Sequence, residues 1–155
     1  MKALHEPQRR WLVMAIALAW RAISSRSAEA QDGQGGSVVV SGAWARAVTP
    51  EARESQGFFI VRNAGATADL LVSAWSPDVE TARVLERDPI SAGAFRPPAE
   101  GLPILPGGTL TLEPGGPYLA LNGLRQPLGS GNMIRVFLRF AQAGDVPVEL
   151  RGHDH

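Results

Sequence analysis

The stretch that decides the fold is NMIRVFLRF, residues 132–140. From residue 134 onward every even position is apolar, whereas the odd positions 135 and 139 are arginines. Successive side chains of a β-strand point to opposite faces of its sheet. The segment is therefore predicted to be a strand with one face in a hydrophobic core and the other in water, the usual arrangement in antiparallel sheets.

Segments of the same kind occur outward from this one at spacings of about ten residues, separated by Gly, Pro and Asn turn signals. Residues 79–87 could also form a helix, but Pro77 and Pro89 bracket them closely and favour a strand. Residues 97–106 contain four prolines and are predicted to be a loop. The other predicted strands are residues 37–44, 56–63, 69–75, 79–87, 109–113, 118–121 and 146–150. The pattern indicates an all-β domain, an antiparallel sandwich or barrel of about eight or nine short strands.

The first thirty residues are predicted to be a signal peptide. Basic residues precede the ten-residue apolar run WLVMAIALAW (residues 11–20), and Ala28-Glu29-Ala30 is a small-x-small cleavage site. An uncleaved membrane anchor is the alternative, but a membrane-spanning helix needs about 20 apolar residues. We therefore expect cleavage after Ala30, a periplasmic location and no membrane span after cleavage. Because the sequence has no cysteine, a lipid anchor is not expected.

The processed chain is expected to hold one domain. Residues 31–36 are Gly-rich and predicted to be a flexible lead-in, residues 37–150 form the β-domain, and residues 151–155 form a polar tail. Removing residues 1–30 takes away five of the 15 basic residues and two of the 15 acidic ones, which leaves ten and thirteen and a net charge of −3. A negative chain is a poor electrostatic binder of nucleic acid, so no nucleic-acid partner is expected.

Residue types also limit the chemistry. The absence of cysteine excludes disulfides, thiolate metal sites and cysteine nucleophiles. Only His153 and His155 remain after residue 30, so the predicted domain has no histidine base to activate a hydroxyl nucleophile. The carboxylate pairs Glu51/Glu54 and Glu86/Asp88 lie in polar contexts and are expected to be solvated. The sequence therefore predicts a protein that is not an enzyme.

The sequence contains a series of short motifs in a characteristic order. They are AWAR (43–46) with Thr49-Pro50, GFFI (57–60), NAG (63–65), DLLV (69–72), LEPGG (112–116) and NGL (122–124). In order and spacing they resemble the periplasmic copper chaperones called PCu(A)C, over residues 40–150. The resemblance implies a cupredoxin-like Greek-key sandwich or barrel and copper as the family cofactor. It also implies copper-delivery or respiratory-oxidase-assembly proteins as partners, although the sequence does not name a partner.

The resemblance further implies a copper site made by a His, a Met eleven residues later, and a His-x-Met pair twenty-two residues after that Met. Anchored on the Pro-Gly-Gly turn at residues 114–116, this spacing falls on Leu85, Arg96, Tyr118 and Ala120. None of the four carries an imidazole or a thioether, the donors that suit copper. We therefore predict a degenerate site with no metal and no cofactor at these family positions.

The tail sequence His153-Asp154-His155 is the remaining metal-like feature. Its two imidazoles are predicted to be, at most, a weak site for a divalent metal. Two functional classes stay open on the sequence alone. One is a copper-chaperone-like protein linked to copper delivery, and the other is a non-metal binding or protein-interaction module on the same fold.

Overall fold

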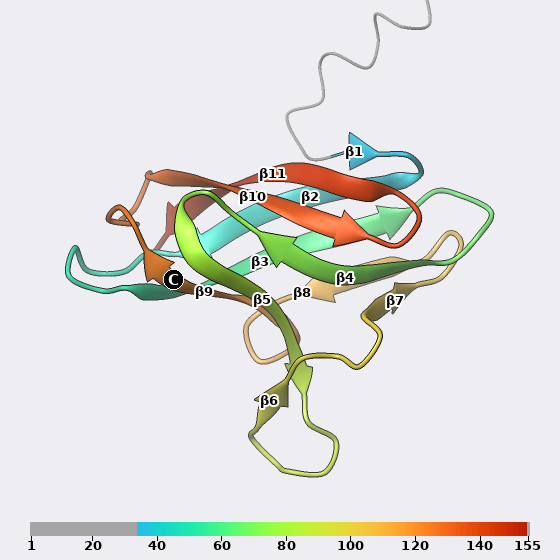
Figure 1. Cartoon of the computed structure of the whole chain (residues 1–155), viewed down its shortest axis with the longest axis horizontal. Helices are drawn as coiled ribbons and strands as arrows, with labels where there is room; N and C mark the ends of the chain where they lie inside the picture. The colour runs from blue at the N-terminus through green and yellow to red at the C-terminus, as the bar shows by residue number, and fades with distance from the viewer. Residues whose placement is uncertain (1–33, 155) are drawn as a thin grey trace, which may run out of the picture. The chain divides into compact units, whose positions relative to one another are not determined.

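The computed structural model describes residues 34–154, and in that part of the chain the only regular elements are strands (Figure 1). The eleven strands are β1 (Gln34–Gly35), β2 (Val38–Arg46), β3 (Glu54–Asn63), β4 (Asp69–Trp75), β5 (Val79–Arg87), β6 (Phe95–Arg96), β7 (Leu102–Ile104), β8 (Thr109–Leu112), β9 (Tyr118–Leu124), β10 (Met133–Phe140) and β11 (Gly144–His153). The all-β prediction is confirmed.

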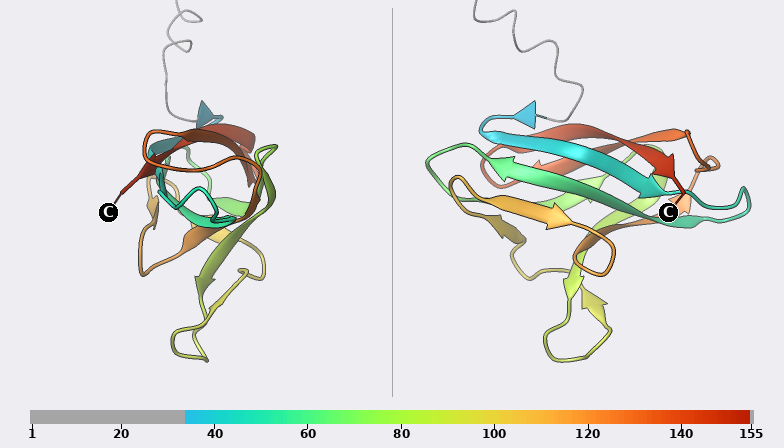
Figure 2. Two further views of the ribbon diagram at one scale, coloured as in Figure 1. Left: turned by 90° about the vertical axis from the view of Figure 1, so that its left-hand side faces the viewer. Right: turned by 180° about the vertical axis from the view of Figure 1, so that it is seen from behind.

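The strands form one unclosed sheet in the order β6-β5-β9-β3-β2-β11-β10-β4-β7, with β1 paired to β2 and β8 paired to β3. The pairs are antiparallel except for β2 and β11, which run parallel. Figure 2 shows that the sheet curls around a common interior, and Figure 1 shows that the end of β5 projects from it with β6 as an arm.

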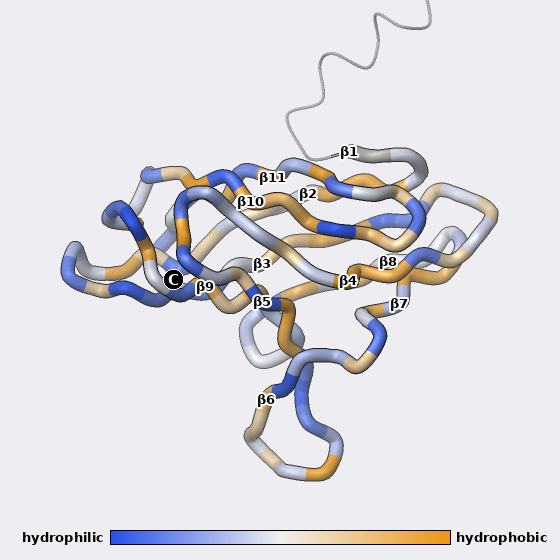
Figure 3. The backbone as a smooth tube through the Cα atoms, viewed as in Figure 1, coloured by the Kyte–Doolittle hydropathy of each residue, from blue (hydrophilic) through white to orange (hydrophobic). Residues whose placement is uncertain are grey.

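The core lies inside the curled sheet and follows the period of two. On β10 the even residues are buried, and on β11 Val146, Val148 and Leu150 are buried while the residues between them are exposed. Figure 3 shows the same alternation as orange and blue segments along these strands. The deciding stretch of the sequence therefore behaves as predicted.

The strand count is higher than predicted, because three short strands lie in segments that lack a strand pattern. β7 lies inside the predicted loop 97–106: Leu102 and Ile104 are buried, while Pro103 between them is exposed. A proline is tolerated there because β7 is an edge strand, where one row of backbone groups needs no partner. β6 lies in the segment between residues 88 and 97, and β1 lies at the end of the expected lead-in.

The two ends of the expected domain also differ from the prediction. β11 runs from Gly144 to His153, so the first three residues of the expected polar tail belong to a strand. They do so because Arg151, Gly152 and His153 pair with Trp44, Ala45 and Arg46 of β2. The predicted signal peptide, the first residues of the lead-in and His155 lie outside the described residues.

A bulge in β2 decides which side chains reach the outer face. Gly42 adopts a φ of 60°, which favours glycine, and the register with β3 shifts between Ser41 and Trp44. Before the bulge Val38 and Val40 point into the core, and after it Ala45 does. Trp44 and Arg46 are thereby placed on the outer face.

Candidate functional site

Three of the four family positions lie together on the outer face of β5 and β9. Leu85 and Tyr118 are directly opposite each other in the antiparallel pair, and Ala120 lies two residues along β9, opposite Arg83. Opposite residues carry their side chains on the same face. The structure therefore brings Leu85, Tyr118 and Ala120 together, each half-buried.

Arg96 is turned away from this group. It lies opposite Glu86 on β5, and its Nε is 3.8 Å from the Glu86 carboxylate oxygen Oε1. Because Glu86 follows Leu85 on the strand, its side chain is on the other face. The spacing from the Pro-Gly-Gly turn thus counts to a residue that does not face Tyr118.

Phe95 takes the place that counting gives to Arg96. It lies opposite Arg87, and its ring packs edge-on against Tyr118 with a centroid separation of 5.0 Å and an angle of 75°. Sequence reasoning missed Phe95 because the loop between β5 and β6 can absorb a one-residue shift. The signal available in the sequence was the alternation of β5, which places Arg87 on the same face as Leu85. The residue paired with Arg87, which is Phe95, therefore also lies on that face.

Arg87 lies on the same face of β5 as Leu85 and contacts Phe95. Its guanidinium carbon lies 5.5 Å from the centre of the Phe95 ring, a cation–π distance. Its Nε donates a hydrogen bond of 2.6 Å to the carbonyl oxygen of Gly115, in the turn between β8 and β9. Two aromatic rings and a fixed positive charge therefore occupy the neighbourhood that the family spacing assigns to copper.

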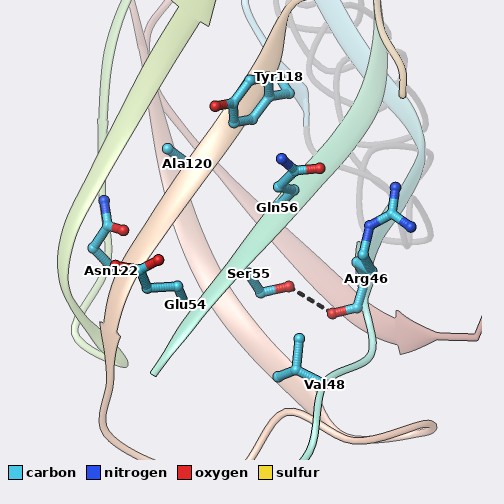
Figure 4. A pocket seen from close by; sticks show the side chains of 8 residues that line it. All are labelled: Arg46, Val48, Glu54, Ser55, Gln56, Tyr118, Ala120 and Asn122. Carbon is cyan, nitrogen blue, oxygen red and sulfur yellow. Dashed lines mark hydrogen bonds between the residues drawn. The ribbon is translucent and has the colours of Figure 1, made fainter. Parts of the chain in front are cut away.

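Beside this group a pocket of about 310 Å³ opens on the outer face (Figure 4). Its floor is β3, one wall is β9, and the opposite wall is the end of β2. The lining residues are Arg46, Val48, Glu54, Ser55, Gln56, Tyr118, Ala120 and Asn122. Two of the family positions, Tyr118 and Ala120, are thus part of a space that carries both charges and amides.

Arg46 is held in place on its wall of the pocket. Its guanidinium carbon lies 6.0 Å from the centre of the Phe58 ring, and that ring packs against Trp44 at 4.6 Å. Its backbone carbonyl accepts a hydrogen bond from the Ser55 hydroxyl, as Figure 4 shows. Phe58 lies on the outer face of β3, outside the main core cluster, and its side chain is nevertheless buried. Its ring therefore gives the guanidinium of Arg46 a fixed surface to pack on.

The tail histidine that the structure describes is not a loose end. His153 is the last residue of β11, opposite Arg46, and its ring lies edge-on to Trp44 at 6.4 Å. Within residues 34–154 no group of three or more His, Asp or Glu side chains could hold a metal ion. A weak divalent site at His153 and His155 stays a prediction.

Comparison with known proteins assigns the family. The model of the family described as "Putative lipoprotein LpqE-like" matches residues 38–151. The chain belongs to the LpqE-like family. A relative called "Putative lipoprotein Lxx21020", from Leifsonia xyli subsp. xyli, is 32% identical over 123 residues, which cover 79% of this chain and 73% of the relative.

Solved structures similar to this member of the LpqE-like family include PCuAC domains. The apo PCuAC domain from PmoF1 has a TM-score of 0.67 and 25% identity, with 80% of this chain and 99% of that one covered. Apo-DR1885 from Deinococcus radiodurans has a TM-score of 0.60 and 26% identity, with coverages of 83% and 87%. The copper-bound PCuAC domain from PmoF2 has a TM-score of 0.66 at 19% identity, with coverages of 81% and 100%, which shows the fold alone. The PCu(A)C resemblance and the cupredoxin-like fold are confirmed.

Proposed function

We propose that this LpqE-like chain is an exported, periplasmic, copper-chaperone-like protein with a degenerate metal site. It acts as a non-metal binding or interaction module on the PCuAC fold, and it has no enzymatic activity. The proposal rests on one observation, the set of side chains at the position that the family spacing assigns to copper. Leu85, Phe95 and Tyr118 fill it with apolar and aromatic groups, and Arg87 adds a guanidinium.

The chemistry of this group opposes a copper ion. Cu(I) is selected by soft sulfur and imidazole donors held in a fixed geometry. A guanidinium has no lone pair to donate and stays charged at any physiological pH. The phenol oxygen of Tyr118 is a hard donor, which suits the soft Cu(I) ion poorly. A copper ion placed here would have no sulfur or imidazole ligand, and it would lie beside the positive charge of Arg87.

Export is proposed on two supports, the leader-like residues 1–30 and the lipoprotein name of the relative. Within the described part of the chain no helix is long and apolar enough to cross a membrane.

A competition titration with Cu(I) tests the metal part of the proposal. The exported protein is titrated against a Cu(I) chelator, in parallel with a variant carrying His153→Gln and His155→Gln. We expect neither protein to take Cu(I) from the chelator, because neither offers soft donors at the family position. Weak Cu(II) uptake by the parent, measured separately, is expected to disappear in the double variant.

The opposite result has a clear meaning. If the double variant still holds one Cu(I) ion tightly against the chelator, the degenerate-site proposal is wrong. Copper delivery, with respiratory oxidase assembly as its destination, would then be the function to pursue.

A further inference from the structure

The pocket beside the family position carries opposite charges on opposite sides. Figure 4 shows Arg46 on one side and Glu54 on the other, with Gln56 between them. Strand pairing gives the same separation, because Arg46 ends β2 whereas Glu54 begins β3 directly opposite Asn122 of β9. The two charged groups therefore face one space from two different strands.

Among the residues that the structure describes, neither charge has an ion-pair partner. The ion pairs found within residues 34–154 join Arg96 to Glu86, Arg135 to Glu149 and Arg139 to Asp145, and none includes Arg46 or Glu54. Arg46 is nevertheless fixed by Phe58 beneath it. A planar guanidinium that is held in place and has no carboxylate partner within residues 34–154 is suited to bind a carboxylate of a ligand with two hydrogen bonds.

The middle of the pocket offers neutral hydrogen-bonding groups and open space. Gln56 and Asn122 contribute side-chain amides, and Tyr118 contributes a hydroxyl. Ala120 lies opposite Gln56 and has no side chain beyond Cβ, which leaves room above the sheet. The volume of about 310 Å³ is at the small end of the range for ligand pockets, which is about 300–1,000 Å³.

We propose that this pocket binds a small zwitterion, with its carboxylate on Arg46 and its ammonium group on Glu54. A simple anion would be repelled by Glu54 and a simple cation by Arg46, whereas a zwitterion satisfies both. Free amino acids and short peptides share this chemistry. The inference rests on the proposed function as a binding module and names the ligand class of that module.

The test is binding of four alanine compounds to the exported protein, with a metal chelator present so that copper cannot contribute. They are L-alanine, L-alanyl-L-alanine, N-acetyl-L-alanine and L-alaninamide, titrated while the backbone amide signals are followed by NMR. We expect saturable binding of L-alanine or the dipeptide, with shifts confined to β2, β3 and β9. The tighter of the two identifies the source as a free amino acid or a peptide.

Removing a charge from the ligand and removing its partner from the pocket are then expected to have corresponding effects on affinity. Loss of the ammonium group by acetylation, or of the carboxylate by amidation, is expected to weaken binding about fivefold or more, as for charge-assisted hydrogen bonds. Arg46→Gln should remove the difference between alanine and alaninamide, and Glu54→Gln should remove the difference between alanine and N-acetylalanine. Arg46→Lys keeps the charge and the packing stem, and should retain part of the preference.

The controls are Arg62→Gln and Glu100→Gln, which change exposed charges outside the pocket and should leave all four affinities unchanged. Absence of saturable binding of both zwitterions would overturn the proposal, as would equal binding of all four compounds. The result is independent of the copper titration. Tight Cu(I) with intact alanine selectivity would overturn the degenerate site alone, and no Cu(I) with no zwitterion binding would overturn the ligand class alone.

Discussion

Asp145 and Arg139 form an ion pair on the outer face of the sheet, where Trp75 of β4 also stacks on Phe137 of β10. The Asp145 carboxylate accepts hydrogen bonds from Arg139, 2.9 Å from Nε and 3.3 Å from Nη2, and interacts with the side chain of Trp75. The Trp75 ring stacks on Phe137 with a centroid separation of 4.3 Å and an angle of 10°. One exposed carboxylate therefore holds the guanidinium of Arg139 with two hydrogen bonds.

The hydrogen bond from Arg139, together with its charge, lowers the pKa of Asp145 below the ordinary value. A carboxyl group whose pKa is lower in the folded state stabilises the fold above the unfolded pKa, and this contribution is lost as the pH falls through the folded pKa. We expect NMR titration of the side-chain carboxyl to give a pKa below the ordinary value of an aspartate, and we expect Arg139→Gln to raise it. Arg135→Gln, whose partner is Glu149, is the matched control. An unchanged value in Arg139→Gln would contradict the assignment.

Single residues also mark the limit of sequence reasoning about the site. Leu85, Tyr118 and Ala120 could be placed together, because they lie on two alternating strands. Arg96 could not be placed, because its position depends on how the loop between β5 and β6 closes, and one residue there exchanges the faces of the strand. The pocket was also not predictable, because Arg46, Glu54 and Asn122 meet only through the order of β2, β3 and β9.

At the scale of elements, the hairpin between β10 and β11 is anchored to the start of β4 by Asp69. This carboxylate is buried, with 5% of the residue exposed. Its Oδ1 accepts hydrogen bonds from the backbone N–H groups of Leu70 and Gln142, both at 2.8 Å, and its Oδ2 accepts one from Ala143 at 3.0 Å. Two elements that are distant in sequence are thus joined through one side chain.

Asp69→Asn should therefore destabilise the protein strongly for an isosteric change. The amide NH₂ cannot accept a hydrogen bond, so at least one buried N–H is left facing a donor, at a cost of about 1–3 kcal/mol. The measurement is the urea midpoint of unfolding at constant slope. Asp88→Asn is the matched control, because Asp88 accepts its hydrogen bond from Ile90 in an exposed turn, and it should change stability by less than about 0.5 kcal/mol. Equal effects of the two changes would refute the anchoring role.

The elements differ in how well their sequence revealed them. β4, β5 and β10 were predicted within a residue, because each alternates or is bounded by turn signals. β7 was hidden, because two of its three residues are apolar but the third is Pro103 in a proline-rich segment. The parallel pairing of β11 with β2 was also hidden, since it joins residues about a hundred positions apart and leaves no local pattern.

On the scale of the whole molecule, the sheet brings three of the four family positions to one face, where their side chains carry neither an imidazole nor a thioether. β5 and β9 place Leu85 opposite Tyr118, with Ala120 on the same face, and the arm of β5 and β6 returns Phe95 to the Tyr118 ring. These are the positions of two imidazoles and a thioether in the spacing that the family resemblance implies, with a fourth donor beside them. The backbone can therefore be tested separately from the ligands.

Two sets of substitutions make that test. Both contain Leu85→His, Tyr118→His and Ala120→Met, and the fourth change is Phe95→Met in one set and Arg96→Met in the other. We expect the set with Phe95→Met to bind Cu(I) more tightly in competition with a chelator, because residue 95 shares the face of the new histidines. Residue 96 faces Glu86 instead. Reverting either histidine should weaken binding by far more than reverting either methionine, because a thioether is a weaker donor than an imidazole.

Tighter binding by the Arg96→Met set would show that the family spacing, rather than the face on which β6 presents its side chains, decides where the fourth ligand belongs. Failure of both sets to bind, with β-rich circular dichroism intact, would show that the arm of β5 and β6 no longer closes over this face as a metal site requires.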